Sequence, residues 1–139
     1  MTDVPRRILL VEDDVEDDDD HAELFRLAFP DRGVRPAGTA EAALAVLLDP
    51  GTPRPDLVGR DLEPSGHDGL HVLRRVRDEP RLAGLPAAVL TTSRARRDRI
   101  AVAEIGADAY DEKPTGGDDL ARLQERIDGR WPRWRRRPA

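Results

Sequence analysis

The segment ILLVEDD, residues 8–14, joins a run of four apolar residues to three acids. A continuous apolar run of this length is typical of a strand that is buried on both faces of a parallel sheet. The acids then mark the carboxyl end of that strand. Because ligands of open α/β sheets bind at the carboxyl ends of the strands, the sequence predicts a polar site that begins here.

Four further apolar segments follow and alternate with helical patterns. We expect these strands at residues 34–37, 56–61, 86–90 and 107–112, and helices at residues 21–29, 40–48, 69–77, 93–105 and 118–128. Thr39 and Ser93 can cap two of the helices, and Gly106 suits a helix C-terminus. Strict alternation of strands and helices predicts an α/β fold in which five helices cover both faces of a parallel sheet.

Length and composition limit the class of protein. With 139 residues the chain is expected to form one domain. The absence of Cys excludes a disulfide scaffold, a Cys-ligated zinc site and thiol chemistry. No apolar stretch approaches the roughly 18 residues of a membrane span, and no secretory signal precedes the first strand. We therefore expect a cytoplasmic protein without a membrane partner.

The net charge of −5 is unevenly distributed. Eight of the nine residues from Glu12 to Asp20 are acidic, whereas residues 130–137 contain five Arg and two Trp. Lys113 is the single lysine among the 23 basic residues. The acids at residues 16–20 are expected to form a solvated loop, or to lower the local potential beside a cation site.

Groups of complementary charge follow four of the predicted strands, and parallel strands bring such ends to one edge. They are the acids at residues 12–14, then Asp61, Thr91 and Lys113. Crowded carboxylates repel one another unless a cation neutralises them, and oxygen ligands suit Mg²⁺. Lys113 and Thr91 could bind phosphoryl oxygens, and Asp61 could accept the phosphoryl group as a nucleophile. The sequence therefore predicts a site for phosphoryl transfer.

Five segments carry a resemblance to a known family: ILLVEDD, PDLVGRDL, DGLHVLRRVR, AAVLTTS and GADAYDEKP. Their order and spacing, along residues 6–128, resemble the response-regulator receiver domains of two-component signalling. The resemblance implies a flavodoxin-like, doubly wound sheet of five parallel strands in the order 2-1-3-4-5 with five helices. It implies a receiver domain over residues 1–129, a basic extension over residues 130–139, and no output domain.

The same resemblance implies roles for individual residues. Asp61 would be the phosphoacceptor, assisted by Thr91 and Lys113, in a protein that catalyses only its own phosphorylation and dephosphorylation and is not otherwise an enzyme. The residues assigned to Mg²⁺ are Glu12, Asp13, Asp61 and, through its backbone carbonyl, Glu63. Thr91 and Tyr110 would form a switch that reshapes the surface of helix four, strand five and helix five. The Lys113–Pro114 bond would be cis.

The ending RIDGRWPRWRRRPA, residues 126–139, is similar to the helix extension of stand-alone regulators that serve phytochrome-type kinases. This similarity implies a histidine kinase of that type as phosphodonor and a separate downstream protein partner. The Trp131, Trp134 and arginine cluster has three interpretations: a frayed basic end, a homodimer contact beside the switch surface, or a nucleic-acid patch. An acidic domain repels phosphate backbones, which disfavours the third.

Two departures from the family leave a rival function open. Arg60 precedes Asp61 where the family has an apolar residue, and a buried Arg would need Asp56, Glu63 or the acidic loop as partner. Asp111 stands at a strand position that is usually apolar. These departures favour a pseudo-receiver, a binding module that keeps the fold but works without phosphorylation. A phosphatase of the haloacid-dehalogenase type is disfavoured, because its DxD motif and cap have no counterpart.

Overall fold

The computed structural model describes residues 4–12, 26–62, 70–91, 96–112 and 117–135. The strands are β1 (Arg7–Glu12), β2 (Gly33–Ala37), β3 (Leu57–Leu62), β4 (Ala87–Thr91) and β5 (Ala109–Glu112). The helices are α2 (Ala40–Leu48), α3 (His71–Asp78), α4 (Arg96–Ile105) and α5 (Gly117–Trp134), and residues 26–28 form one further helical turn. No helix in these ranges is long and apolar enough to cross a membrane.

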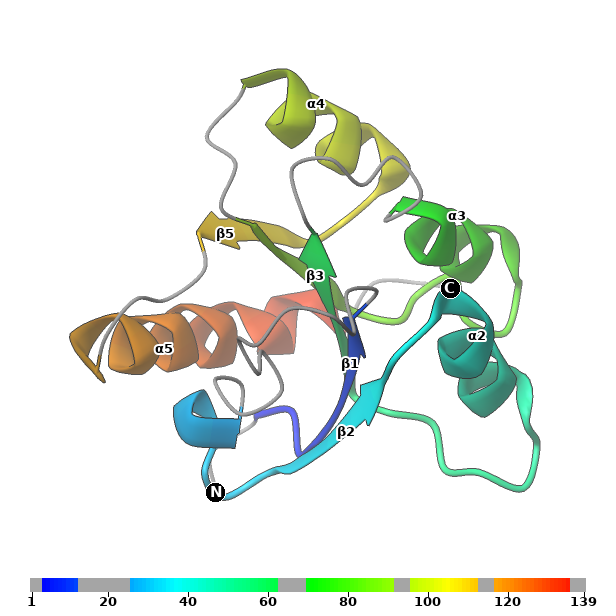
Figure 1. Ribbon diagram of the computed structural model, residues 1–139, viewed down its shortest axis with the longest axis horizontal. Helices are drawn as coiled ribbons and strands as arrows, with labels where there is room; N and C mark the ends of the chain where they lie inside the picture. Colours follow the sequence, from blue (N-terminus) through cyan, green and yellow to red (C-terminus); the bar gives the residue numbers. More distant parts are fainter. Residues whose placement is uncertain (1–3, 13–25, 63–69, 92–95, 113–116, 136–139) are drawn as a thin grey trace.

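All five strands run parallel in one sheet, in the order β2-β1-β3-β4-β5 (Figure 1). The flavodoxin-like order predicted from the sequence is confirmed. A helical segment lies between each strand and the next one along the chain, and connections of this kind are what parallel strands require. The arrangement leaves β2 and β5 as the edges of the sheet and places β1, β3 and β4 in its centre.

Apolar side chains alternate between the two faces of the sheet and meet different helices. On one face, Ile8, Leu10 and Leu57 pack against α5 and the turn at residues 26–29. On the other face, Leu9 and Val58 pack against α2 and α3, while Val89 packs against α3 and α4. The central strands are therefore buried on both faces, as the apolar run at residues 8–11 predicts.

The predicted bounds of the second helix are those of α2. Thr39 has an extended backbone, and its side-chain oxygen accepts a hydrogen bond from the amide of Ala42 at 3.0 Å. This contact satisfies one of the amides that a helix leaves unpaired at its start. The first predicted helix lies largely outside the described residues, as does the predicted cap Ser93.

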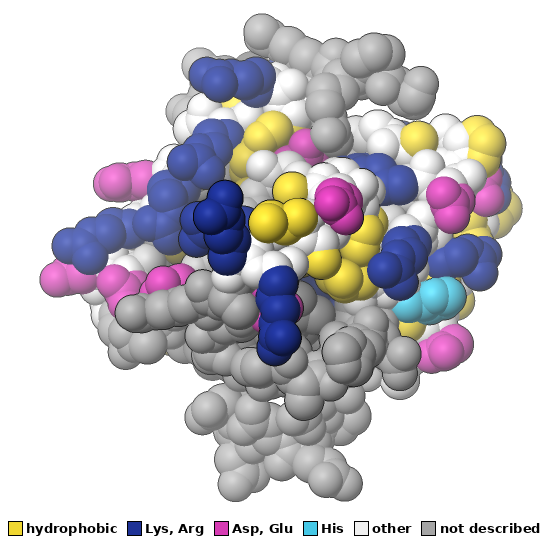
Figure 2. Space-filling view, turned by 90° about the horizontal axis from the view of Figure 1, so that it is seen from above, with side chains coloured by type: hydrophobic (Ala, Val, Ile, Leu, Met, Phe, Trp, Pro, Cys, Tyr) yellow, Lys and Arg dark blue, Asp and Glu magenta, His cyan; other side chains and the backbone are white. Residues whose placement is uncertain are grey.

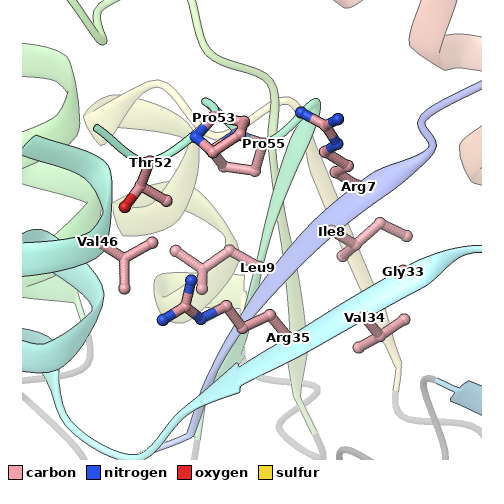
Figure 3. A pocket seen from close by; sticks show the side chains of 10 residues that line it. All are labelled: Arg7, Ile8, Leu9, Gly33, Val34, Arg35, Val46, Thr52, Pro53 and Pro55. Atoms are coloured by element: carbon pink, nitrogen blue, oxygen red, sulfur yellow. The ribbon is translucent and has the colours of Figure 1, made fainter. Parts of the chain in front are cut away.

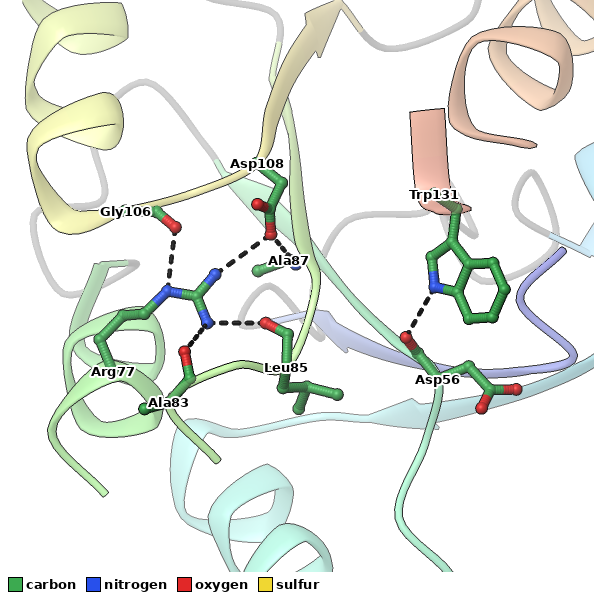
Figure 4. Close-up of polar contacts among 8 residues, drawn as sticks. All are labelled: Asp56, Arg77, Ala83, Leu85, Ala87, Gly106, Asp108 and Trp131. Atoms are coloured by element: carbon green, nitrogen blue, oxygen red, sulfur yellow. Dashed lines mark hydrogen bonds and ion pairs between the residues drawn. The ribbon is translucent and has the colours of Figure 1, made fainter. Parts of the chain in front are cut away.

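The last helix is longer than predicted. The predicted helix ends at residue 128, whereas α5 continues to Trp134 and includes Pro132. Trp131 and Trp134 are both buried in the core, and the indole nitrogen of Trp131 donates a hydrogen bond to the backbone oxygen of Asp56 at 3.0 Å (Figure 4). Residues 130–134 are thus a structural part of the folded domain, which excludes a frayed end for them.

A second contact fixes the same helix to the segment before β2. The guanidinium of Arg32 donates two hydrogen bonds to the Asp128 carboxylate, at 2.9 and 2.7 Å. Both side chains are largely shielded from solvent. The hydrogen bond to Asp128 raises the pKa of Arg32, so the guanidinium keeps its charge in this contact.

The largely buried side chain of Arg77, in α3, contacts four residues outside its helix (Figure 4). It donates to the backbone oxygens of Gly106 at 2.9 Å, Ala83 at 3.0 Å and Leu85 at 2.6 Å, and to the Asp108 carboxylate at 3.2 Å. The same Asp108 oxygen accepts the amide of Ala87, where β4 begins, at 2.8 Å. We call this set of contacts the Arg77 clamp.

Gly106 is the point where the clamp meets the end of α4. Its φ is +101°, which L side chains rarely adopt, and this agrees with the predicted helix C-terminus. A Cβ atom at this position would also lie 3.2 Å from Nε of Arg77. Backbone conformation and close packing therefore both require glycine here.

Candidate functional site at the carboxyl edge of the sheet

The register of the strands brings three of the predicted site positions to one edge. Glu12 of β1 is paired with Asp61 of β3, and the next residue of β3, Leu62, is paired with Thr91 of β4. Thr91 is paired in turn with Glu112, the last residue of β5. The backbone thus places an acid, the predicted phosphoacceptor and the predicted hydroxyl on neighbouring strands.

The remaining predicted residues, Asp13, Glu63 and Lys113 together with the Lys113–Pro114 bond, lie outside the described residues, and so do the side chains of Glu12 and Asp61. Within the described part of the chain, no three His, Cys, Asp or Glu side chains gather as a metal site would need. The expected donors at this edge are carboxylate and carbonyl oxygens, a set that suits a hard divalent cation.

Thr91 and Tyr110 lie on the same face of the sheet. Tyr110 is paired with Val89, two residues before Thr91, and side chains two residues apart in a strand share a face. Thr91 is fully buried, whereas Tyr110 is only partly buried and packs against the cluster of Val89 and Val102. The guanidinium of Arg99, in α4, stands over the Tyr110 ring at 5.6 Å from its centroid. This cation–π contact couples β5 to α4.

Arg60 is buried, with 2% of its surface exposed, directly before Asp61. Its Nη1 donates a hydrogen bond to the backbone oxygen of Val11, its neighbour in β1, at 3.1 Å. Asp56, one partner considered in the sequence analysis, instead accepts hydrogen bonds from the amides of Arg6 and Arg7. A buried cation therefore lies on the strand pair that carries Glu12 and Asp61.

Asp111, the other departure from the family, contacts α5. Its Oδ1 accepts a hydrogen bond from Nε of Arg126 at 3.1 Å, and its side chain is 11% exposed. Its Oδ2 is buried and has no hydrogen-bond partner among the described residues. The acid at this strand position thus serves as an ion-pair partner that joins β5 to α5.

A polar cavity of about 340 Å³ lies between α4, β5 and α5. Basic and acidic side chains line it together: Arg99, Arg122, Arg126, Asp111, Glu112 and Asp119, with Tyr110 among them. From this side of the molecule, arginine side chains form a band flanked by carboxylates (Figure 2). Sequence reasoning expected the surface but not its arginines, because exposed charges on a helix carry no signal that separates a binding face from ordinary solvated surface.

Comparison with known proteins gives a family match over most of the chain. The family model described as the response regulator receiver domain matches residues 8–127. Response regulator Rcp1 of Synechocystis sp. is 33% identical over 131 residues, which cover 91% of this chain and 89% of Rcp1. The KDP operon transcriptional regulatory protein KdpE of Escherichia coli is 34% identical over 113 residues, which cover 81% of this chain but 47% of KdpE.

Solved structures agree with this match. The crystal structure of the Mn²⁺-bound form of response regulator Rcp1 superposes with a TM-score of 0.69 and 29% identity, covering 97% of this chain and 98% of that one. The phosphorylated cyanobacterial phytochrome response regulator RcpA has the same TM-score at 22% identity and covers 96% of this chain and 97% of its own. Because this identity is lower, the similarity to RcpA is evidence for the fold alone.

Proposed function

Because the chain belongs to the response-regulator receiver domain family, we propose that Asp61 accepts a phosphoryl group from the phosphohistidine of a histidine kinase. The observation that supports this most is the strand register, which sets Asp61 beside Glu12 and brings Thr91 to the same edge. The protein then acts as a phosphorylated signal carrier, with no turnover of a separate substrate.

The proposed transfer exchanges one bond to phosphorus for another. A carboxylate oxygen of Asp61 attacks the phosphorus atom while its bond to the imidazole nitrogen of the kinase breaks, and the leaving imidazole takes up a proton. Lys113 and the Thr91 hydroxyl stabilise phosphoryl oxygens. Mg²⁺, held by Glu12, Asp13, Asp61 and the carbonyl of Glu63, would neutralise the crowded negative charge. The Mn²⁺-bound form of the relative Rcp1 supports a divalent cation in this role.

The signal leaves the site through the contacts of β5. We infer that movement of Thr91 towards the phosphoryl group frees space for Tyr110 on the same face of the sheet. Inward movement of Tyr110 would end its stacking with Arg99 and so release β5 from α4. A local charge change is thereby converted into a change of the α4-β5-α5 surface, which is where we place contacts with a downstream protein or a second copy of the chain.

We propose a phytochrome-type histidine kinase as the phosphodonor. This choice rests on the similarity of residues 126–139 to the ending of regulators that serve such kinases. Trp131 and Trp134 are buried in the core, whereas Arg130 and Arg133 of this segment are exposed and could contact a partner. A direct test is phosphotransfer to this chain from an autophosphorylated phytochrome-type kinase compared with an unrelated histidine kinase.

Phosphorylation is tested by incubation with acetyl phosphate and Mg²⁺ followed by intact-mass measurement. Wild type is expected to gain one phosphoryl group and Asp61→Asn none. Asp78→Asn, which removes an exposed carboxylate at the end of α3, is the matched control and is expected to behave as wild type. An unmodified wild type, or equal modification of Asp61→Asn, would contradict the proposal.

Arg60 favours one alternative, the pseudo-receiver. A buried guanidinium beside the acceptor position could satisfy the carboxylates permanently, as a cation would, and leave no role for phosphorylation. Arg60→Leu separates the two functions. If phosphorylation is the function, both wild type and Arg60→Leu gain a phosphoryl group. If the chain is a pseudo-receiver, only Arg60→Leu gains measurable modification.

A further inference from the structure

A second cavity lies at the opposite edge of the sheet, where β1 and β2 begin. Its volume is about 450 Å³, and it opens between β1, β2, α2 and the segment at residues 52–55 (Figure 3). Pockets that bind small organic molecules have volumes of about 300–1,000 Å³. Within the described part of the chain, no residue with a proposed role in phosphoryl transfer lines this cavity.

Its floor is apolar and belongs to the core. Leu9 of β1 is buried and packs with Val46 of α2, which is only partly covered. Pro53 and Pro55 close the side next to β3. Because β2 is an edge strand of the sheet, no other strand of the described ranges covers the cavity from outside. An apolar group that entered here would remove both its own surface and the exposed part of Val46 from water.

Gly33 is the reason that the space is open. It is paired with Arg7, and Leu9 is paired with Arg35, so these four positions share the face that α2 covers. A Cβ atom built on Gly33 would come no closer than 3.9 Å to another atom, the backbone oxygen of Arg6. The φ of Gly33 is not positive, so other residues could adopt it. Neither backbone nor packing requires glycine at this position, yet any larger residue would fill part of the cavity.

The described lining of the cavity is positively charged. Arg7 and Arg35 both belong to it, and among the residues that the structure describes it contains no Asp or Glu. Both side chains are exposed, and among the described residues neither guanidinium forms a hydrogen bond or an ion pair. Figure 3 shows Arg7 beside Pro55 and Arg35 on the side of Val46, so the two charges flank the apolar floor.

We propose that this cavity is a binding site for a small molecule with an apolar body and an anionic group, either a carboxylate or a phosphate. The apolar body would cover Leu9 and Val46, and the anionic group would accept charge-assisted hydrogen bonds from Arg7 or Arg35. Guanidinium groups match the oxygens of both anions and give short, strong contacts with them. The site is independent of Asp61 and of phosphorylation.

The proposal is tested by NMR titration of the ¹⁵N-labelled full chain, without Mg²⁺ or phosphodonor. The probes are 4-phenylbutyrate and phenyl phosphate, with the neutral 4-phenylbutanamide for comparison. Saturable shifts of the amide signals of Leu9, Gly33 and Val46 are expected with at least one of the anions, and the more strongly bound anion identifies the head group. The neutral amide is expected to bind about tenfold more weakly, which is the effect of losing one charge-assisted hydrogen bond.

Two variants and one control assign the binding to this cavity. Gly33→Val places a side chain in part of the cavity and is expected to abolish the saturable shifts. Arg35→Gln should weaken anion binding about tenfold and leave binding of 4-phenylbutanamide unchanged. Gly38→Ala adds a methyl group where no atom lies within 4 Å and should bind as wild type. Circular dichroism verifies that each variant is folded. Unchanged binding by folded Gly33→Val, equal binding of amide and anions, or the absence of saturable shifts at these amides would overturn the proposal.

Discussion

Removing the Arg77 side chain tests how much the Arg77 clamp contributes to the stability of the fold. In Arg77→Ala the oxygens of Gly106, Ala83 and Leu85 lose their guanidinium donor, and the Asp108 carboxylate loses its counterion. The Asp108 side chain is only 4% exposed, so water replaces the guanidinium poorly. It retains the amide of Ala87 as a donor.

The cost can be estimated from these contacts. A hydrogen bond to a charged group contributes about 1.5–3 kcal/mol, but four bonds that share one guanidinium do not add fully. Breaking a buried ion pair by removing one partner costs about 3–5 kcal/mol, and we expect a loss in that range for Arg77→Ala. A chain of this size has a free energy of unfolding of roughly 7–20 kcal/mol, so the loss is a large fraction of it. The melting temperature should fall by about 10–15 °C.

Urea unfolding followed by circular dichroism measures this loss. Arg81→Ala is the matched control, because Arg81 is 65% exposed and pairs with Glu79 at 3.4 Å, and we expect a change below about 1 kcal/mol. A double-mutant cycle of Arg77→Ala with Asp108→Asn should give a coupling energy of about 1–3 kcal/mol. An Arg77→Ala protein that unfolds at the same urea concentration as Arg81→Ala would refute the reasoning.

Three further changes follow from single contacts. Trp131→Phe leaves the Asp56 oxygen without its indole donor and should lower the free energy of unfolding, measured in urea titrations, by about 2 kcal/mol. An unchanged free energy of unfolding would contradict a stabilising role for this hydrogen bond. Gly106→Ala forces a side chain into a positive φ and against the clamp, and should cost about 2 kcal/mol by the same assay. Hydrogen bonds from the Thr52 hydroxyl and a backbone amide lower the pKa of Asp49, so Thr52→Val should raise that pKa in an NMR titration, and no rise would contradict the assignment. The lowered pKa means that the stabilising contribution of this exposed carboxylate is present above its unfolded pKa of about 3.9 and is lost as the pH falls through the folded value.

The fold was predictable because its signals are local and agree with one another. The apolar run at residues 8–11 indicates a strand buried on both faces, and the alternation of strands and helices leaves few arrangements other than a parallel sheet. Thr39 starts one helix and Gly106 terminates another, both for reasons of backbone chemistry that do not depend on the rest of the fold. The strand order came from the family resemblance, since periodicity alone does not distinguish neighbouring strands.

The predicted end of the last helix is wrong because opposing signals meet there. Gly129 and Pro132 both suggest a break, yet Ile127, Trp131 and Trp134 continue the helical spacing of the apolar face. Burial of two large aromatic side chains outweighs the cost of a Pro in the final turns. Attention to that spacing alone would have placed both Trp in the core.

Long-range polar contacts were not predictable from the sequence. Arg77 is one of 23 basic residues, and nothing next to it marks it as buried. Its partners are backbone oxygens and Asp108, which is 31 residues away along the chain. The partner of Arg60 was missed for the same reason, because a backbone oxygen on a neighbouring strand has no signature in the sequence.

The clamp also determines how α4 can move. Val102 is the one buried residue of this helix, and the backbone oxygen of Gly106, just after the helix, is held by Arg77. The opposite end of α4 follows β4, whose last residue is Thr91 of the proposed switch, and there Arg99 contacts the Tyr110 ring. The two ends of the helix are therefore held differently, one by a guanidinium outside the switch and the other by a switch residue. The proposed inward movement of Tyr110 would loosen α4 at its start while Arg77 keeps its C-terminal end in place.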